Sequence, residues 1–213
     1  MEKEIGKKMK DVYNEQFKEH GYNPASLGCA KGRQHLRFKA LSAHLERGSL
    51  LDFGCGFGDL SIYLENYKKE INYSGCDVMD NFLSTAKEQY PNKNFFKIEI
   101  GENINKEYDY IVASGVFNFL YSTNKIEHQE FVFATIANLF SSTTKVLSID
   151  FLSPFVDFVG PDAYHQNITE LTSFISSNIS QRLSIDHTYM PYEYCIHIFK
   201  KDEILRPDNV FKT

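Results

Sequence analysis

A chain of 213 residues, 42% hydrophobic and 15% aromatic, is long and apolar enough to fold as one domain around a substantial core. Its formal net charge of −5 lacks the basic excess with which nucleic-acid-binding proteins hold phosphates, so we expect no nucleic-acid partner. The charged N-terminal stretch is followed by no apolar segment, and no apolar run approaches the roughly 18 residues of a membrane span. We therefore expect a cytoplasmic protein without a membrane anchor, and this composition is compatible with a homodimer.

The order of the predicted elements favours an α/β protein. Apolar residues at helical spacing predict two helices before the first strand, over residues 3–19 and about 32–46. Later patterns predict strands at 50–53, 71–77, 94–100, 109–118, 145–151, 182–189 and 192–200, and helices from 60, at 82–90, at 126–140 and at 167–179. The last two strands are joined by so short a turn that they must be antiparallel neighbours. We expect a single domain with a helical cap (1–46), a core (47–200) and a polar tail (201–213).

Three glycines stand at every second position between the first strand and the helix that follows it. Gly54, Gly56 and Gly58 come after Asp52 in the pattern D-x-G-x-G-x-G. Glycine removes the Cβ atoms that would keep a ligand off the backbone, and it permits a positive φ in the turn. The sequence therefore predicts a ligand that lies close against this loop.

The spacing of these glycines separates two classes of ligand. A dinucleotide fingerprint needs G-x-G-x-x-G, and its last glycine would fall at position 59, which is Asp. A carboxylate at a helix N-terminus repels a pyrophosphate, whereas the acid before the first glycine suits a ligand with an ammonium group. An NAD-dependent oxidoreductase is therefore a less favoured alternative.

A second acidic residue, Asp77, ends the second predicted strand, 19 residues beyond Gly58. In open α/β sheets the ligand lies across the carboxyl ends of the strands. A carboxylate at that edge can accept hydrogen bonds from both hydroxyls of a ribose. Asp77 is therefore our candidate for ribose binding.

These features resemble the class I S-adenosylmethionine (AdoMet) dependent methyltransferases. The likeness runs from about residue 10 to residue 200, and its most specific parts are Asp52 to Gly58, Asp77 and Ala113 to Asn118. The region before the glycine loop is similar to a bacterial subset of small-molecule methyltransferases, of which some serve surface-polysaccharide biosynthesis. The resemblance implies a Rossmann-like, doubly wound, seven-stranded, mostly parallel sheet with an antiparallel last strand and an N-terminal helical lid. It also implies AdoMet as cofactor and methyl transfer to an O or N atom of a small molecule.

The same resemblance implies how the cofactor is held. Asp52 and the carbonyl groups near Ala113 and Ser114 face its ammonium group, the three glycines line its methionine and ribose, and Asp77 binds the ribose. Five further contacts are implied: Val78 and Met79 or Ile100 on the faces of the adenine, Glu99 at its exocyclic amine, and Tyr13 over the carboxylate end. For Tyr13 a role in the core is equally open.

A hydroxyl acceptor requires a base, and His165 is the candidate because it ends the loop 152–166 above the carboxyl edge of the sheet. Asp150, at the end of the fifth strand, is placed to orient it, while a structural or helix-capping role is the alternative. Candidate acceptor contacts are Asn118, Tyr164, Tyr189 and Tyr192, with Arg33 and Arg37 for an anionic group. Each of these six has a structural alternative, in the core or as a solvated charge. No set of side chains has metal-ligand spacing, so we expect no metal.

Other functions remain open beside small-molecule methylation: a nucleic-acid or protein methyltransferase, and a cofactor-binding subunit without catalysis. An adenine-methylating enzyme of nucleic acids would carry [DN]-P-P-[YF] after the fourth strand, where this chain has Ser114-Gly115-Val116-Phe117. A subunit that binds AdoMet without catalysis would show cofactor binding and no turnover. The four cysteines, Cys29, Cys55, Cys76 and Cys195, form no C-x-x-C pair and are expected to be reduced thiols.

Overall fold

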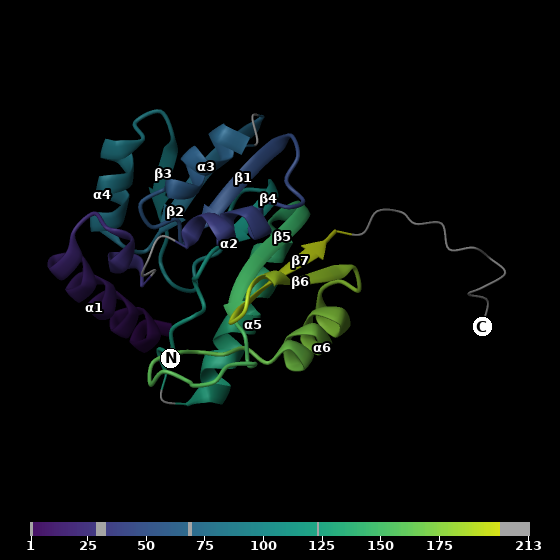
Figure 1. Ribbon diagram of the computed structural model, residues 1–213. Helices are drawn as coiled ribbons and strands as arrows, with labels where there is room; N and C mark the ends of the chain where they lie inside the picture. The colour runs from purple at the N-terminus through teal and green to yellow at the C-terminus, as the bar shows by residue number, and fades with distance from the viewer. Residues whose placement is uncertain (1, 29–32, 68–69, 123, 201–213) are drawn as a thin grey trace, which may run out of the picture.

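The structure, a computed structural model, describes residues 2–28, 33–67, 70–122 and 124–200, so the expected polar tail and Cys29 lie outside the described residues. Its elements follow one another along the chain in the order drawn in Figure 1: α1 (Glu2–His20), η1 (Pro24–Leu27), α2 (Gln34–Leu41), β1 (Gly48–Phe53), α3 (Asp59–Tyr67), β2 (Ile71–Asp77), α4 (Asp80–Gln89), β3 (Asn94–Lys97), β4 (Tyr108–Ala113), α5 (Lys125–Ser141), β5 (Thr143–Leu152), α6 (Ile168–Asn178), β6 (Leu183–Met190) and β7 (Glu193–Phe199).

The seven strands form one sheet in the order β3-β2-β1-β4-β5-β7-β6. β1 lies in the middle of the parallel part, between β2 and β4, while β3 and β5 extend it on either side. β7 runs antiparallel to both β5 and β6. This confirms the doubly wound, mostly parallel sheet with a reversed last strand, and it brings the carboxyl ends of β1, β2 and β4 to one edge.

Helices cover both faces of the sheet and enclose two large apolar clusters (Figure 1). On one face, α5 and α6 contribute residues such as Ile136 and Leu171 to a cluster that also takes in Ile5 and Met9 of α1. On the other face, Leu41 of α2, Leu60 and Leu64 of α3 and Leu83 of α4 pack against the strands. The helix α1 therefore docks by its apolar stripe, as predicted, beside the carboxyl edge of the sheet.

Three predicted elements are too long. β3 ends at Lys97 rather than at residue 100, because β2, its pairing partner, ends at Asp77 opposite Lys97. β4 ends at Ala113 because the chain turns at Gly115, whose φ is +72°. α2 ends at Leu41, where Ser42 closes it by main-chain hydrogen bonds back to Phe38 and Ala40. In contrast, the predicted N-cap of α6 is confirmed, since the Asn167 side chain accepts hydrogen bonds from two main-chain N–H groups.

Cys55, Cys76 and Cys195 are buried and unpaired. Within residues 2–28, 33–67, 70–122 and 124–200, no helix is both long enough and apolar enough to cross a membrane.

Candidate cofactor site

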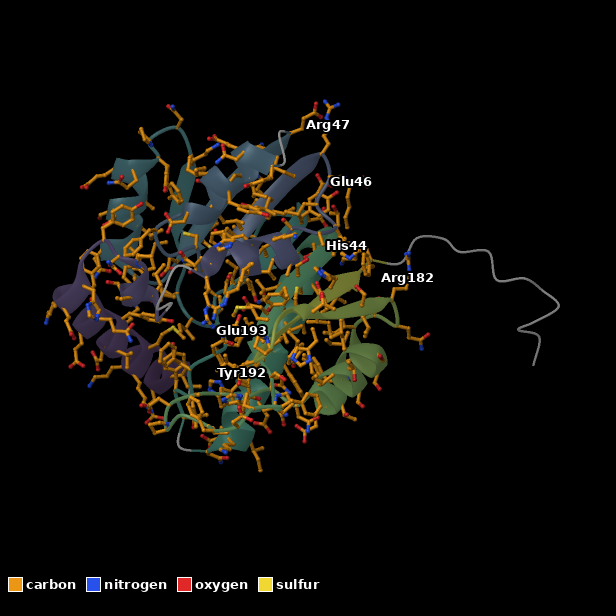
Figure 2. The ribbon with its side chains drawn as sticks, in the orientation of Figure 1. His44, Glu46, Arg47, Arg182, Tyr192 and Glu193 are labelled. Carbon is orange, nitrogen blue, oxygen red and sulfur yellow. The ribbon has the colours of Figure 1, made fainter. Side chains whose placement is uncertain are left out.

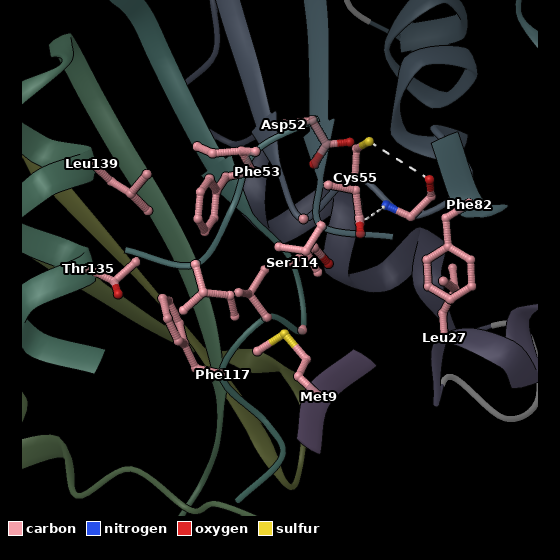
Figure 3. Close-up of a pocket in the computed structure, with 18 of the residues that line it drawn as sticks. Met9, Leu27, Asp52, Phe53, Cys55, Phe82, Ser114, Phe117, Thr135 and Leu139 are labelled. Atoms are coloured by element: carbon pink, nitrogen blue, oxygen red, sulfur yellow. Dashed lines mark hydrogen bonds between the residues drawn. The ribbon is translucent and has the colours of Figure 1, made fainter. Parts of the chain in front are cut away.

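A cavity of about 390 Å³ opens at the carboxyl ends of β1, β2 and β4. Thr135 and Leu139 reach it from α5, while Phe82 and Leu27 border it on the opposite side (Figure 3). Predicted cofactor residues that line it are Tyr13, Asp52, Gly54, Gly56, Asp77, Val78, Glu99, Ile100 and Ser114. The fold therefore brings most of the predicted set, which spans about 100 residues of sequence, to one place.

The glycine loop is tied to the neighbouring strand by its own backbone. The N–H groups of Gly54 and Cys55 both donate to the carbonyl oxygen of Cys76, at 2.8 and 3.0 Å. Gly54 has a φ of +71°, and a Cβ there would lie 2.6 Å from Cγ2 of Val116. Glycine suits that position, because the backbone there is left-handed and the loop after β4 leaves no room for a Cβ.

Asp52 is buried at the carboxyl end of β1, and it is 3% exposed. Its Oδ2 accepts a hydrogen bond of 2.7 Å from the hydroxyl of Tyr73. Burial raises the pKa of Asp52 to about 7, the hydrogen bond from Tyr73 opposes this, and the nearby carboxylate of Asp77 adds to it. Because ionising this buried carboxyl group is costly, a cationic ligand beside it would strongly stabilise its carboxylate form.

Asp77 is buried at the carboxyl end of β2 and braces the glycine loop. Its Oδ2 accepts from the N–H of Gly56 and its Oδ1 from the N–H of Met79, both at 2.9 Å. Burial raises its pKa to about 6 in spite of these bonds. The N–H of Val78 also lowers the pKa of Asp77 by hydrogen bonding, so of the roughly four acceptor sites of a carboxylate about one stays open for a ligand hydroxyl.

The adenine end of the predicted site is more exposed than the rest. Val78 and Ile100 line the cavity there, whereas Met79 packs in a small cluster with Phe57 and Phe82 and is not among the lining residues described. Glu99 lines the cavity but lies in the loop after β3, where its carboxylate is 2.6 Å from Nζ of Lys10 in α1. This ion pair lowers the pKa of Glu99. It also joins α1 to the wall of the cavity.

Gly58, the third glycine of the loop, is not among the described residues that line the cavity. A Cβ at Gly58 would lie 2.6 Å from the ring of Phe95 and 3.3 Å from that of Tyr90. Its φ is +81°. The glycine here serves close packing of the loop against β3, which is a different reason from the predicted contact with a ligand.

Replacing Gly58 by alanine should therefore lower stability and spare ligand binding. We expect the free energy of unfolding to fall by about 1–3 kcal/mol, because both the backbone and the Phe95 ring oppose a Cβ. Gly21→Ala is the matched control, since Gly21 also has a positive φ (+60°) but nothing within 4 Å of its Cβ position. Thermal melts and titrations with S-adenosylhomocysteine (SAH) check both variants. A Gly58→Ala protein with normal stability and lost affinity would contradict this interpretation.

The predicted base, His165, is not brought to the cavity. Its Nδ1 lies 2.6 Å from the carbonyl oxygen of Ser153, across a bridge between the two ends of the 152–166 loop. The expectation that Asp150 orients His165 is wrong. Asp150 instead accepts hydrogen bonds from the Gly115 N–H and the Ser114 hydroxyl, at 2.6 and 3.4 Å. The position of His165 favours the structural alternative, which ties the loop together.

Most predicted acceptor contacts have structural partners of their own. Asn118 accepts from the Leu152 N–H, Tyr164 donates to Gln166, and the exposed Tyr192, labelled in Figure 2, donates to Asp157. Arg33 is exposed at the start of α2 and is not among the described lining residues. The hydroxyl of Tyr189 is buried and has no hydrogen-bond partner among the described residues.

Arg37 is the exception among these candidates, because it does line the cavity. It is not a solvated helix charge: its guanidinium makes two hydrogen bonds with the carboxylate of Glu193, one of them of 2.6 Å from Nε. Glu193 stands at the start of β7 (Figure 2) and was not predicted as part of the site. In the sequence, the one feature that points to Glu193 is its position just after the predicted turn at Met190-Pro191.

Comparison with known proteins agrees with this geometry. Residues 51–148 match a family model described as a methyltransferase domain. A candidate methyltransferase of Mycobacterium tuberculosis is 27% identical over 154 residues, which are 71% of this chain and 93% of that protein. A candidate methyltransferase of Invertebrate iridescent virus 6 is 30% identical over 129 residues, or 59% of this chain, which spans 46% of the viral protein.

Solved structures of low sequence identity share the fold. The magnesium protoporphyrin IX methyltransferase of Synechocystis PCC 6803 with bound SAH aligns with a TM-score of 0.63 at 16% identity, covering 94% of this chain and 98% of that one. The DhpI complex with SAH aligns with a TM-score of 0.66 at 12% identity, covering 92% and 97%.

Proposed function

We propose that this chain, which belongs to the class I AdoMet-dependent methyltransferases, transfers the methyl group of AdoMet to an O or N atom of a small-molecule acceptor. The observation that carries the proposal is the pair of buried carboxylates, Asp52 and Asp77, at the carboxyl ends of the neighbouring strands β1 and β2 in one cavity. A surface-polysaccharide or other secondary biosynthetic route is the setting that the sequence resemblance suggests.

The residues present fit the cofactor. Asp77 would retain acceptor capacity for a ribose hydroxyl beyond the main-chain N–H groups that it already binds. Asp52, with its raised pKa, would be stabilised as a carboxylate by the ammonium group. Val78 and Ile100 supply apolar surface for the adenine, with Glu99 close to its edge.

When bound, the cofactor supplies an electrophilic methyl group on a sulfonium, which an acceptor atom attacks in line. The chain contributes alignment and exclusion of water, and such alignment provides much of the acceleration of a two-reactant step. α1 is suited to this role, because Met9 and Tyr13 line the cavity and the ion pair of Lys10 with Glu99 holds the helix against it. Ser114 and Gly115, which follow β4, line the same cavity.

A small acceptor is favoured over a macromolecule. The described lining residues include five carboxylates and one guanidinium: Asp52, Asp59, Asp77, Glu99, Glu102 and Arg37. A cavity lined by this excess of carboxylates repels the phosphate backbone of a nucleic acid. Met9 and Tyr13 of α1 also cover part of the cavity.

The test is methyl transfer from labelled AdoMet to pools of small metabolites, with total RNA and DNA as parallel substrates. We expect label in the small-molecule fraction and none above background in nucleic acid. Removing residues 2–20, which form α1, should abolish this transfer, because the lid provides both alignment and water exclusion. Robust labelling of RNA or DNA would contradict the proposal, and so would full activity without α1. Binding of AdoMet with no transfer to any pool would favour the non-catalytic subunit.

A further inference from the structure

The cavity has two sides that differ in chemistry, and the end of β1 contributes to both. Successive side chains of a strand point to opposite faces of a sheet. Asp52 therefore meets Tyr73 on one face, whereas Phe53 packs against the apolar cluster that contains α5 on the other. Near Phe53 lies what we call the α5 side, lined by Met9, Phe53, Phe117, Phe131, Thr135 and Leu139. Figure 3 shows Phe53, Phe117 and Leu139 across the cavity from Phe82.

The walls of the α5 side are buried and offer few hydrogen bonds. Phe117 and Leu139 are each 1% exposed. The hydroxyl of Thr135 already donates to the carbonyl oxygen of Phe131 at 2.8 Å. Asn138, a further polar residue of α5 that lines the cavity, donates to the amide oxygen of Asn103. A ligand group on this side therefore gains mainly by burying apolar surface.

The connection from β3 to β4 explains why the fold leaves a hollow here. The other connections among strands β1 to β5 carry the helices α3, α4 and α5, whereas residues 98–107, all of which the structure describes, contain no helix. Part of this face is covered by α1 instead, since Ile5 and Met9 join Ile98 in one apolar cluster. The α5 side is thus bounded by α1 and α5 rather than filled by a crossover helix.

We propose that the α5 side binds an apolar ring of the methyl acceptor, so that the acceptor is an aromatic small molecule. The inference rests on the proposed function of this cavity and adds the class of acceptor to it. The rings of Phe53, Phe117 and Phe131 line this side, and aromatic walls favour a flat apolar partner. Asp52 and Asp77 draw the ammonium group and the ribose of the cofactor to the carboxylate-bearing side, which leaves the α5 side for the acceptor.

The adenine of the cofactor is the rival occupant, because it too is flat and largely apolar. A neutral two-ring compound, 2-naphthol, separates the two possibilities by calorimetry. We expect it to bind the SAH-saturated protein with an affinity within about threefold of that for the ligand-free protein. Displacement of 2-naphthol by SAH would overturn the inference and place the adenine on the α5 side. Absence of 2-naphthol binding would overturn it as well.

Thr135→Trp is the decisive variant, because it adds an indole ring where the α5 side would hold its ligand. It should bind 2-naphthol at least about tenfold more weakly, while its affinity for SAH changes by less than about twofold. The matched control is Thr172→Trp on α6. Thr172 is also half-buried, and its hydroxyl also donates to the carbonyl oxygen four residues earlier, at 2.9 Å, but it is not among the described lining residues. This control should keep both affinities.

A second variant, Ala134→Phe, decides if Thr135→Trp fails to fold. Ala134 lines the cavity but is exposed, so the fold tolerates a larger side chain there. Unchanged 2-naphthol affinity in the folded variant would overturn the inference, and so would an equal loss of 2-naphthol and SAH. A wild-type protein that binds 2-naphthol but not SAH would contradict the proposed cofactor site and leave the apolar site standing.

The class of acceptor has its own measurement in the transfer assay with labelled AdoMet. We expect the labelled products to partition into ethyl acetate, because an aromatic acceptor stays apolar after methylation. Thr135→Trp should lose this labelling, whereas Thr172→Trp should keep it. Label confined to charged, water-soluble products would overturn the assignment of an aromatic acceptor.

Discussion

Asp77→Ala is expected to weaken the binding of SAH by more than about tenfold, because the ribose hydroxyls lose a buried charged acceptor. Part of this loss comes through the loop, since the Asp77 carboxylate also accepts the N–H groups of Gly56 and Met79. Two main-chain donors left unpaired in a buried turn loosen the surface on which the cofactor lies. Calorimetry at pH 8, where Asp77 is ionised, gives the measurement.

The control for Asp77 must lose comparable bonds away from the cavity, and Asp109→Ala does this. Asp109 accepts from the N–H of Ser49 at 2.9 Å and from the hydroxyl of Thr144 at 3.1 Å, at the opposite end of the sheet. Both variants should melt at lower temperature, while only Asp77→Ala should lose affinity. Equal affinities of Asp77→Ala and wild type would remove the ribose assignment.

The order of the strands and the position of the glycine loop could be predicted because the signals are local. An apolar run that breaks into D-x-G-x-G-x-G predicts a strand end and a turn without knowledge of the rest of the chain. Because parallel strands point the same way, their carboxyl ends meet at one edge of the sheet, and ligands of open α/β sheets bind at that edge. For this reason Asp52 and Asp77 could be placed together from the pattern, whereas Val78 was placed by the resemblance to the methyltransferase family.

The parts that could not be predicted depend on partners far away in the sequence. Arg37 reads as a surface charge of an amphipathic helix, and only the return of the chain at β7 brings Glu193, 156 positions later, onto its guanidinium. Gly58 looks like a ligand contact by spacing alone, but the ring that excludes a Cβ comes from Phe95 on β3. For His165, the length of the loop predicted that the chain returns to the sheet edge. The contact of its Nδ1 with the carbonyl oxygen of Ser153 instead holds it outside the cavity.

Cofactor affinity is expected to depend steeply on pH on the acid side. Burial raises the pKa of Asp52 to about 7 and that of Asp77 to about 6, and the proposed placement of the cofactor requires both as carboxylates, one for its ammonium group and one for its ribose. Protonation from pH 8 to pH 5 leaves about 1% of Asp52 and about 10% of Asp77 ionised, so SAH should bind roughly 10³-fold more weakly at pH 5. The stability of the ligand-free protein should move the opposite way. Because both pKa values lie above the unfolded value of 3.8, the folded state holds these protons more tightly, and the two groups cost stability as pH rises from about 4 to 7.

Asp52→Asn separates the two carboxylates in this titration. The amide keeps an oxygen to accept from Tyr73 but cannot ionise, so the variant should bind SAH weakly at pH 8 and lose only about another tenfold by pH 5, from Asp77 alone. Calorimetric titrations at pH 5, 6, 7 and 8 on both proteins measure how the affinity for SAH depends on pH. Melting curves of the ligand-free forms measure how stability depends on pH. A wild-type affinity that stays level between pH 8 and pH 5 would show that neither carboxylate meets the ligand. A pH dependence that persists unchanged in Asp52→Asn would assign the ammonium group to a different acceptor, such as the carboxylate of Asp59, which also lines the cavity.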